Sequence, residues 1–548
     1  MADNPPLTMP ARSQRERARG IGPFPRFLAP GLLLLLASGC ATLHQTPPAP
    51  SFAYDHPEAT RLGRALAPAQ QRHPGDSGFG ILEYGLESLV ARAALADTAD
   101  QTIDAQYYIY DSDEAGSILA EHLLEAADRG VRVRLLLDDY NLGSDSELIA
   151  LSVHPRIQVR VFNPMVFRPR WARLLEYALH FRRATRRMHN KLFIVDNEFT
   201  ILGGRNVGND YFNVRANSVF RDFDVLIAGP ATTQASAAFD QYWNSPWSVP
   251  AVALSGRPRT AADLEKLRYK LNARVRNAER FGEEYAEGRD RYLTDLADDG
   301  KTLVWAHGEV VTDPPRKIAD TSPETRPVAE RLDRELARAK QEVLIEAAYF
   351  VPTQSEIEAF RQLCAHGISI RLVTSALETT DVSMVYSAYQ KYRGDLVAAG
   401  VDLYEYKVHP PQERRDRTWY RLRPSYAALH SKVLVFDGQT AWIGSFNLDP
   451  RSHDLNTEVA VVVDSAELSA KLAESINEDR LPTRSWRIQL QPDPRPAAAG
   501  NSGPPHLVIT WTGEVDDKPV TLFHEPMSFG KRLEVFFLAR IPGIEDQL

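Results

Sequence analysis

The feature of this chain that most constrains its fold is a short motif that occurs twice, 241 residues apart. In each copy a lysine follows a histidine by two residues, and an aspartate follows the lysine by five: His189, Lys191 and Asp196, then His430, Lys432 and Asp437. A glycine-led turn comes after each copy and ends in an asparagine, Asn206 in the first and Asn447 in the second. This repetition indicates one phosphate-handling site built from two similar halves.

The repeat extends upstream of the motifs. A predicted strand at residues 103–109 has its counterpart at 344–350, at the same separation. Each strand is followed by a predicted helix that ends at a glycine and by a second strand: 115–128 and 131–137 in the first half, 355–365 and 368–373 in the second. Strand, helix and strand at this spacing predict parallel strands covered by helices. We therefore expect an α/β fold of two homologous domains.

The motif residues lie in apolar runs, 188–195 and 429–436, that predict buried strands. Side chains alternate across a strand, so each histidine shares a face with its lysine. Asp196 and Asp437 have the opposite parity and lie at the strand ends, where a carboxylate can hold the following turn. We interpret these two aspartates as structural supports.

The residue types in the motifs suit phosphoryl chemistry. Lysine ammonium groups stabilise the extra negative charge of a five-coordinate phosphorus. Asparagine amides can donate to phosphoryl oxygens, and glycine lets a turn come close to a ligand. A histidine titrates near neutral pH, so one can attack phosphorus while the other protonates the leaving oxygen. This scheme requires no metal and no cofactor.

The paired motifs resemble the HKD motifs of the phospholipase D superfamily. The resemblance implies two α/β/α lobes packed with their motifs facing one central cleft. It divides the chain into a first lobe at residues 76–256, a charged linker at 257–327, a second lobe at 328–482 and a C-terminal extension at 483–548. Within the linker, residues 261–298 predict a solvated connecting helix.

The resemblance also implies that a carboxylate orients each catalytic imidazole, as acidic residues do at other histidine-based sites. Glu458 holds this position after the second motif. After the first motif, Asp222 and Asp224 both qualify. An alignment of residues 224–227 with 458–461 favours Asp224 and leaves Asp222 open.

Residues 1–40 predict a signal peptide rather than a part of the fold. Arginines precede a short apolar core, and the sequence Ala-Ser-Gly-Cys that ends at Cys40 resembles a bacterial lipobox, with Cys40 as the lipidated residue. Residues 41–75 then predict a tether. By analogy with bacterial lipoprotein sorting, we expect an outer-membrane lipoprotein that faces the periplasm, with the inner membrane as the alternative.

The charge of the chain and the distribution of its basic residues indicate which binding partners to expect. The formal net charge of −8 argues against a general nucleic-acid-binding surface, so no nucleic-acid partner is expected. Basic and aromatic residues mix before both motifs, at 167–187 and 414–423. Such a mixture suits an anionic membrane surface and would also suit a DNA-binding rim. Residues 530–538 predict a helix that either lies on a membrane or packs on the core.

Several segments beyond the motifs, including residues 203–208, 444–452 and 541–548, resemble bacterial cardiolipin synthases of the C-type group. This implies phosphatidyl transfer with phosphatidylglycerol as a substrate and phosphatidylethanolamine as a second candidate. We favour His189 as the nucleophile and His430 as the proton donor, although the near-symmetry leaves the reverse assignment open. The alternatives are a phospholipase D hydrolase that releases phosphatidic acid, a nuclease-type phosphodiesterase, and a lipid-anchored scaffolding protein.

Overall fold

The computed structural model describes residues 49–140, 147–165, 176, 179–214, 218–278, 281–283, 285–286, 288–289, 302–320, 322–407, 426–494, 506–527 and 529–540. Pro50–Leu548 forms one compact unit, and every element below belongs to it. The expected signal peptide with Cys40 lies outside the described residues. So do the basic segments at 166–175 and 414–423 and the closing residues 541–548.

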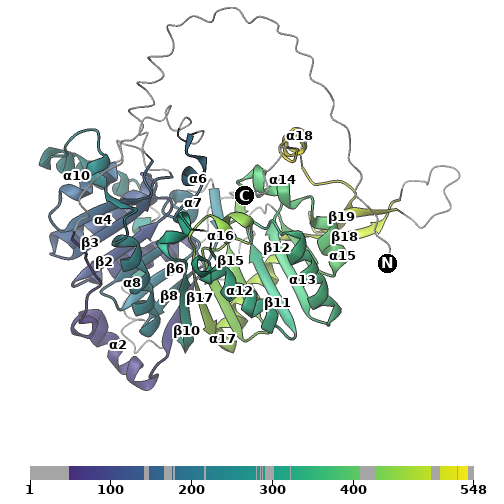
Figure 1. Cartoon of the computed structure of the whole chain (residues 1–548), viewed down its shortest axis with the longest axis horizontal. Helices are drawn as coiled ribbons and strands as arrows, with labels where there is room; N and C mark the ends of the chain where they lie inside the picture. The colour runs from purple at the N-terminus through teal and green to yellow at the C-terminus, as the bar shows by residue number, and fades with distance from the viewer. Residues whose placement is uncertain are drawn as a thin grey trace, which may run out of the picture. The chain divides into compact units, whose positions relative to one another are not determined.

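One mixed sheet of 18 strands runs through the compact unit (Figure 1). Its first half, which we call lobe 1, contains β1 (Ser77–Leu82), β2 (Thr102–Tyr107), β3 (Arg132–Asp138), β4 (Ile157–Phe162), β5 (Leu192–Val195), β6 (Phe199–Gly203), β8 (Asp224–Ala228) and β9 (Ser248–Pro250). Its second half, lobe 2, contains β10 (Val304–Thr312), β11 (Glu342–Ala347), β12 (Ser369–Ser375), β13 (Asp402–Tyr406), β15 (Lys432–Phe436), β16 (Thr440–Gly444), β17 (Val459–Asp464), β18 (Ser485–Pro492), β19 (Leu507–Val515) and β20 (Lys518–Leu522).

The two lobes repeat one topology. In lobe 1, β2, β3 and β4 pair in parallel, and β5 and β6 continue the sheet antiparallel from β2. In lobe 2, β11, β12 and β13 pair in parallel, and β15 and β16 continue from β11. The crossover helices α4 (Glu114–Asp128) and α13 (Gln354–Ala365) each end before a glycine of positive φ, Gly130 and Gly367. The predicted duplication of a parallel α/β unit is confirmed.

Helices cover the sheet in three groups. Helices α3 (Gly85–Thr98) and α4 pack on lobe 1, and α12 (Pro327–Arg338), α13 and α15 (Arg393–Ala399) pack on lobe 2. Helices α8 (Pro230–Trp243) and α17 (Ala466–Asp479) belong to a buried cluster that contains strand residues of both lobes. The shorter described helices are η2 (Pro57–Ala59), η3 (Glu147–Val153), α6 (Phe181–Ala184), α7 (Asn209–Phe212), α9 (Ala251–Leu254), η4 (Pro315–Ile318), η5 (Pro323–Thr325), α14 (Ser383–Tyr389) and α16 (Pro450–Asp454).

Part of the expected tether is folded. Residues 61–72 form α2 (Arg61–Arg72), whose first turn is capped by the Thr60 side chain. Leu62 and Leu66 of this helix are buried in the core of lobe 1. These leucines lie one turn apart and form an apolar stripe that the surrounding Pro, Gln and Arg residues hide in the sequence.

The expected linker contributes to the sheet. Strand β10 lies within residues 257–327 and pairs with β1 on one side and β17 on the other, so it joins the two lobes. Helix α10 (Ala261–Arg276) was expected to be solvated, but it buries Leu264, Leu267 and Leu271 against lobe 1. The three leucines recur at intervals of three and four residues and form an apolar stripe, so only the opposite face of α10 is charged.

The strands of the motifs begin later than predicted. β5 starts at Leu192 and β15 at Lys432, so each histidine precedes its strand. The histidine segments instead pair with the opposite lobe, as described for the active site below, which removes them from the sheet.

Asp196 and Asp437 support the sheet at a different place from the one expected. Asp196 accepts hydrogen bonds from the backbone N–H groups of Asp100, Gln101 and Thr102, at the start of β2. Asp437 accepts equivalent bonds from residues 340–342, at the start of β11. Both aspartates have positive φ, which turns the chain back toward the neighbouring strand. They hold the starts of β2 and β11, the strands that pair with β5 and β15, rather than the following turn.

The C-terminal extension adds an edge to lobe 2. β18 pairs with β13, β19 with β18 and β20 with β19, so the predicted strand pair is confirmed. Helix α18 (Phe529–Leu538) packs against α14 through one face. The described part of the chain contains no helix with both the length and the apolar character needed to cross a bilayer.

The backbone contacts of Asp196 generate a stability prediction. Asp196→Ala leaves three backbone N–H groups without their acceptor, so we expect the free energy of unfolding to fall by about 2–4 kcal/mol. Urea denaturation followed by circular dichroism measures the loss. Asp464→Ala, which removes an exposed carboxylate from β17, is the control and should cost about 0.5 kcal/mol or less. Equal losses in the two variants would contradict this role of Asp196.

Candidate active site

Two short backbone pairings connect the lobes near the motifs. Met188 pairs in parallel with Thr457. Strand β7 (Ser218–Arg221) of lobe 1 pairs in parallel with β14 (Tyr426–Leu429) of lobe 2, with Arg221 opposite Leu429. In a parallel pair, residues that follow matched partners also lie beside each other. Each pairing therefore sets a motif histidine next to an acidic residue of the other lobe.

The first such pair is His189 with Glu458. The backbone N–H of His189 donates to the Thr457 carbonyl at 2.9 Å. The ring nitrogen Nδ1 of His189 lies 2.9 Å from one carboxylate oxygen of Glu458 and 3.1 Å from the other. Both side chains are buried. The contact fixes the imidazole so that Nε2 is the nitrogen left for chemistry.

The second pair is His430 with Asp222. The backbone N–H of His430 donates to the Arg221 carbonyl at 2.7 Å, and Nδ1 of His430 lies 2.6 Å from a carboxylate oxygen of Asp222. Asp222 packs directly on Gly204, where an added Cβ would come within 2.3 Å of its carboxylate. The glycine of the first motif's turn is therefore required by the close approach of this carboxylate.

Asp224, which the sequence alignment favoured as a histidine-orienting carboxylate, does not contact a motif histidine. Gly203 pairs with Asp224 in lobe 1, whereas Gly444 pairs with Ala460 in lobe 2, so the counterpart of Glu458 is Asp222. The alignment that favoured Asp224 was shifted by two residues. Because residues two apart on a strand share a face, the alternation of apolar and polar residues did not reveal this shift. Asp224 instead accepts from Ser88 Oγ at 2.7 Å and from Arg92 at 2.9 Å within lobe 1.

The two lysines lie beside their histidines and are buried. Lys191 Nζ donates to the His189 carbonyl at 2.5 Å and lies 5.6 Å from the centre of the Tyr108 ring. Lys432 Nζ likewise donates to the His430 carbonyl and lies 5.7 Å from the Tyr349 ring. Each tyrosine ring also packs edge-on against the neighbouring histidine. Motif spacing did not indicate these two tyrosines, although they occupy equivalent positions in the repeat.

The asparagines differ between the halves. Asn206 Oδ1 accepts a hydrogen bond from the Ile109 backbone N–H at 3.1 Å, and the Asn206 side chain also contacts the Tyr211 hydroxyl. Asn447 is held by its backbone N–H, which donates to Ser452 Oγ at 3.2 Å. Its side-chain Oδ1 is buried without a hydrogen-bond partner. The role of the two amides as phosphoryl donors stays a prediction.

Burial dominates the electrostatics of the His189 half. Burial, with the positive charge of Lys191 second, lowers the pKa of His189 well below its usual value. Burial lowers the pKa of Lys191 to about 7. Burial also raises the pKa of Glu458 to about 7, although Lys191 opposes that shift. This half therefore favours a neutral imidazole near neutral pH.

The His430 half is more strongly charged. Burial acts to raise the pKa of Asp222, but Lys432 and His430 outweigh it and lower that pKa below its usual value. Burial and Lys432 lower the pKa of His430, and the ionised Asp222 opposes this shift. The pKa of His430 is therefore lowered less strongly than that of His189, because Asp222 opposes the effect of burial.

A buried ion pair in residues 257–327, the segment expected to be a linker, supports Glu458. The sequence motifs did not indicate this pair. Asp313 Oδ2 accepts from the Glu458 backbone N–H at 3.1 Å and from Lys317 Nζ at 2.7 Å. Lys317 Nζ also donates to the Ser452 carbonyl at 2.9 Å, just beyond the Asn447 turn. Both members of the pair are fully buried. The sequence signal is an aspartate directly after a strand with a lysine four residues later, which by itself is common.

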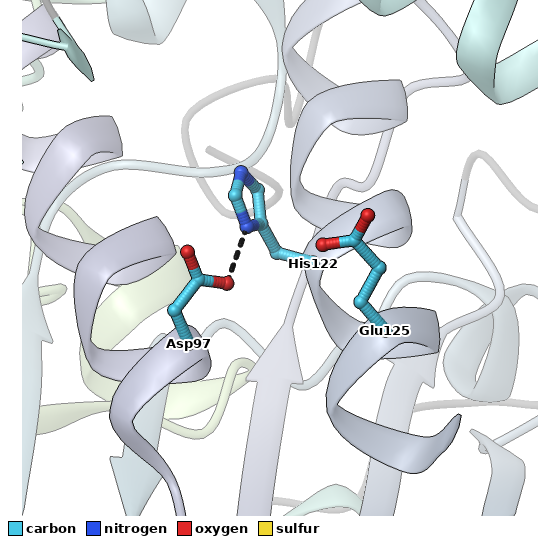
Figure 2. Close-up of side chains that lie close together, drawn as sticks. All are labelled: Asp97, His122 and Glu125. Carbon is cyan, nitrogen blue, oxygen red and sulfur yellow. Dashed lines mark hydrogen bonds and ion pairs between the residues drawn. The ribbon is translucent and has the colours of Figure 1, made fainter. Parts of the chain in front are cut away.

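A separate titratable cluster lies on the helices of lobe 1. Asp97 of α3 faces His122 and Glu125 of α4, and one potential ligand atom of each lies within 4.8 Å of the others (Figure 2). His122 Nδ1 lies 2.7 Å from Asp97, and the Tyr285 hydroxyl donates to the second oxygen of Asp97. These contacts tie the segment after α10 onto α3 and α4. The motif residues take no part in them.

Comparisons with known proteins bear on the family of the chain. The family described as "Cardiolipin synthase, PLD-like domain" matches residues 93–243 and 332–480, one segment in each lobe. Cardiolipin synthase C of Escherichia coli (strain K12) is 35% identical over 489 residues, covering 88% of this chain and 98% of that protein. The major cardiolipin synthase of Bacillus subtilis (strain 168) is 26% identical over 76% of this chain and 71% of its own length. Cardiolipin synthase B of Salmonella typhi is 25% identical over 74% and 84%.

The Asp313–Lys317 pair generates a prediction with a pH dependence. Burial raises the pKa of Asp313 to about 6, above its unfolded value, so its contribution to stability falls as pH rises through about 6. Lys317→Met leaves a buried carboxylate without its counter-charge. We expect a loss of about 3–5 kcal/mol at pH 8 and a smaller loss at pH 5, where Asp313 is protonated.

Urea denaturation of both proteins at the two pH values measures these losses. Lys471→Met is the control, since Lys471 pairs with Glu467 on the exposed side of α17, and it should change stability by about 0.5 kcal/mol or less at either pH. A loss in Lys317→Met that is the same at pH 5 and pH 8 would contradict the titration of Asp313.

Proposed function

The chain belongs to the family of cardiolipin synthases with the PLD-like domain, and from this premise we propose that it is a phosphatidyltransferase that works through a phosphohistidine intermediate. The observation that carries the proposal is the pair of contacts across the lobes, His189 with Glu458 and His430 with Asp222. Each contact occupies Nδ1 and leaves Nε2 as the reactive nitrogen. Two such nitrogens in one site supply a nucleophile and a general acid.

In the first step, Nε2 of His189 attacks the phosphorus of a phospholipid phosphodiester. The bond between phosphorus and the leaving alcohol oxygen breaks, and protonated His430 gives its Nε2 proton to that oxygen. The buried ammonium groups of Lys191 and Lys432 stabilise the negative charge that builds up on the phosphoryl oxygens. Asn206 and Asn447 offer amide donors from the two turns.

In the second step, neutral His430 removes the proton of the incoming alcohol. The alcohol oxygen attacks phosphorus, and the phosphorus–nitrogen bond to His189 breaks. The second step thus returns both histidines to their starting states. With phosphatidylglycerol as the acceptor, a phosphatidyl group transferred to its free hydroxyl gives cardiolipin.

The different electrostatics of the two halves support His189 as the nucleophile. A nucleophilic imidazole must be neutral, and the pKa of His189 is lowered well below its usual value by burial first and by Lys191 second. A general acid must carry a proton, and the pKa of His430 is lowered less than that of His189 because Asp222 opposes the effect of burial, so a proton shared between the two imidazoles resides on His430. Near-symmetric motifs therefore acquire distinct roles from their surroundings.

Two other reactions fit the same residues. Water in place of the alcohol would give phosphatidic acid, and a nucleic-acid phosphodiester would make the protein a nuclease. The identity to cardiolipin synthase C of Escherichia coli across nearly its whole length favours the lipid substrates. The net charge of −8 gives no support to a nucleic-acid substrate.

The proposal predicts the lipid products. Purified protein in detergent micelles with phosphatidylglycerol, alone and with phosphatidylethanolamine, should form cardiolipin, identified by mass spectrometry. His189→Ala and His430→Ala should each lower the rate by roughly 10³-fold or more, because each removes a group that enters a bond-making or proton-transfer step. Phosphatidic acid as the sole product would establish a hydrolase. Full activity in either variant would overturn the mechanism.

The assignment of roles predicts a trapped intermediate in one variant. A p-nitrophenyl ester of a short-chain phosphatidate has a leaving group that departs without protonation. With His430→Ala the first step should proceed and the second should stall, which gives a burst of about one p-nitrophenol per protein. Peptide mass spectrometry should locate the phosphatidyl adduct on His189. His189→Ala is the matched control and should give no burst. A burst and an adduct in His189→Ala instead would reverse the two roles.

A further inference from the structure

The C-terminal helix α18 carries an apolar face that the described part of the chain leaves open. Val535 is buried on the side that packs on α14. On the other side, Phe537 is 62% exposed, Phe536 47% and Leu533 42%. Three large apolar side chains within five residues are costly to hold in water. The exposed face of α18 is therefore suited to an apolar partner.

This helix is connected to the His430 half of the site by direct contacts. Lys531 Nζ of α18 donates to Ser383 Oγ at the start of α14. Two residues before Ser383, Asp381 accepts a hydrogen bond from the Tyr349 hydroxyl at 2.7 Å. The Tyr349 ring packs edge-on against His430. Helix α18 is thus anchored, through the start of α14, to a residue that packs on His430.

A second exposed apolar point lies on the His189 side. Leu179, just before α6, is 60% exposed and Phe181, the first residue of α6, is 46% exposed, and α6 leads into the first motif. Tyr140, also exposed, stacks on Tyr108 with ring centres 5.0 Å apart, and Tyr108 contacts His189. Figure 1 shows α6, α14 and α18 on the upper side of the fold, with α2 and α17 on the lower side. The site therefore lies between two apolar contact points.

The charges beside these points are mainly basic. Arg182 and Arg183 of α6 are exposed, and Arg540 lies over the Phe536 ring after the end of α18. The one acidic side chain on the exposed side of α18, Glu534, pairs with Lys531. Basic residues next to exposed apolar ones suit a surface with anionic headgroups above an apolar interior. The chain as a whole has a net charge of −8, so the positive charge of Arg182, Arg183 and Arg540 beside the exposed apolar residues is a local feature.

We propose that α18 and the α6 region dock the protein on an anionic phospholipid bilayer, with the site facing the headgroups. This inference rests on the proposed function, because it names the surface from which that site takes its lipid. Phe536, Phe537 and Leu533 enter the boundary between headgroups and acyl chains, and the arginines contact the headgroups. Docking in this orientation brings phosphodiester groups to the site without removing the lipid from the bilayer.

The test uses the full chain with Cys40→Ala, so that lipidation at this residue holds no protein to the vesicles. Phe536→Asp/Phe537→Asp is compared with its parent. Phe52→Asp is the matched control, because Phe52 is 61% exposed and its carbonyl is bound by Arg132 at the far end of β3 from the motifs. Binding is measured by sedimentation with vesicles of phosphatidylcholine and phosphatidylglycerol. Turnover is measured on the same vesicles and on a short-chain phosphatidylglycerol below its critical micelle concentration.

We expect the double variant to bind vesicles roughly tenfold or more weakly, because two aromatic rings no longer enter the interface. Its turnover on vesicles should fall in parallel, and its turnover of the dissolved short-chain lipid should equal that of the parent. Phe52→Asp should match the parent throughout. Binding by the parent should also weaken when phosphatidylglycerol is omitted or salt is added.

Three results would overturn the docking surface. Unchanged vesicle binding and turnover in the double variant would show that α18 does not meet the bilayer. Loss of turnover on the dissolved lipid would show that these residues support the site from within. A parent that self-associates without vesicles through the same two phenylalanines would assign the face to a second copy of the chain. A parent that turns over neither form of lipid would instead refute the proposed function, while sedimentation would still report on docking.

Discussion

The site depends on one constraint: each motif histidine is held at Nδ1 by a carboxylate of the opposite lobe. Glu458 and Asp222 are fully buried, and a buried carboxylate without a partner is costly. The backbone pairings of Met188 with Thr457 and of β7 with β14 set these side chains beside their histidines. Neither lobe can form a complete histidine–carboxylate pair alone, so docking of the lobes and assembly of the site are the same event.

The same constraint supports the proposed division of roles between the two copies of the motif. His189 faces a carboxylate whose pKa burial raises to about 7, whereas His430 faces one whose pKa is lowered by Lys432 and by His430 itself. The carboxylates come from equivalent positions but differ in length and in the cations around them. The proposed two-step transfer requires one neutral and one protonated imidazole, and the larger lowering of the pKa of His189 favours the proton on His430.

The segment between the lobes helps to position one of these carboxylates. β10 joins the two halves of the sheet, and Asp313, which follows it directly, holds the backbone of Glu458. Lys317 ties the same aspartate to the backbone after the Asn447 turn. A connection that was expected only to link the domains therefore positions a carboxylate that orients His189. Its charged composition hides this role, because the residues that matter are a single buried ion pair among many solvated charges.

The sequence alone determined the duplicated parallel α/β units, the motif residues and their family, because local periodicity and repeat spacing are written in each half of the chain. Tertiary structure alone decided which carboxylate meets which histidine. Asp222 and Asp224 lie on the same face of one segment, and only the register against β6 separates them. The fold likewise decided that α2 and α10 pack on lobe 1 and that β10 joins the sheet. These outcomes depend on contacts between residues up to 269 positions apart, for which a single sequence carries no local signal.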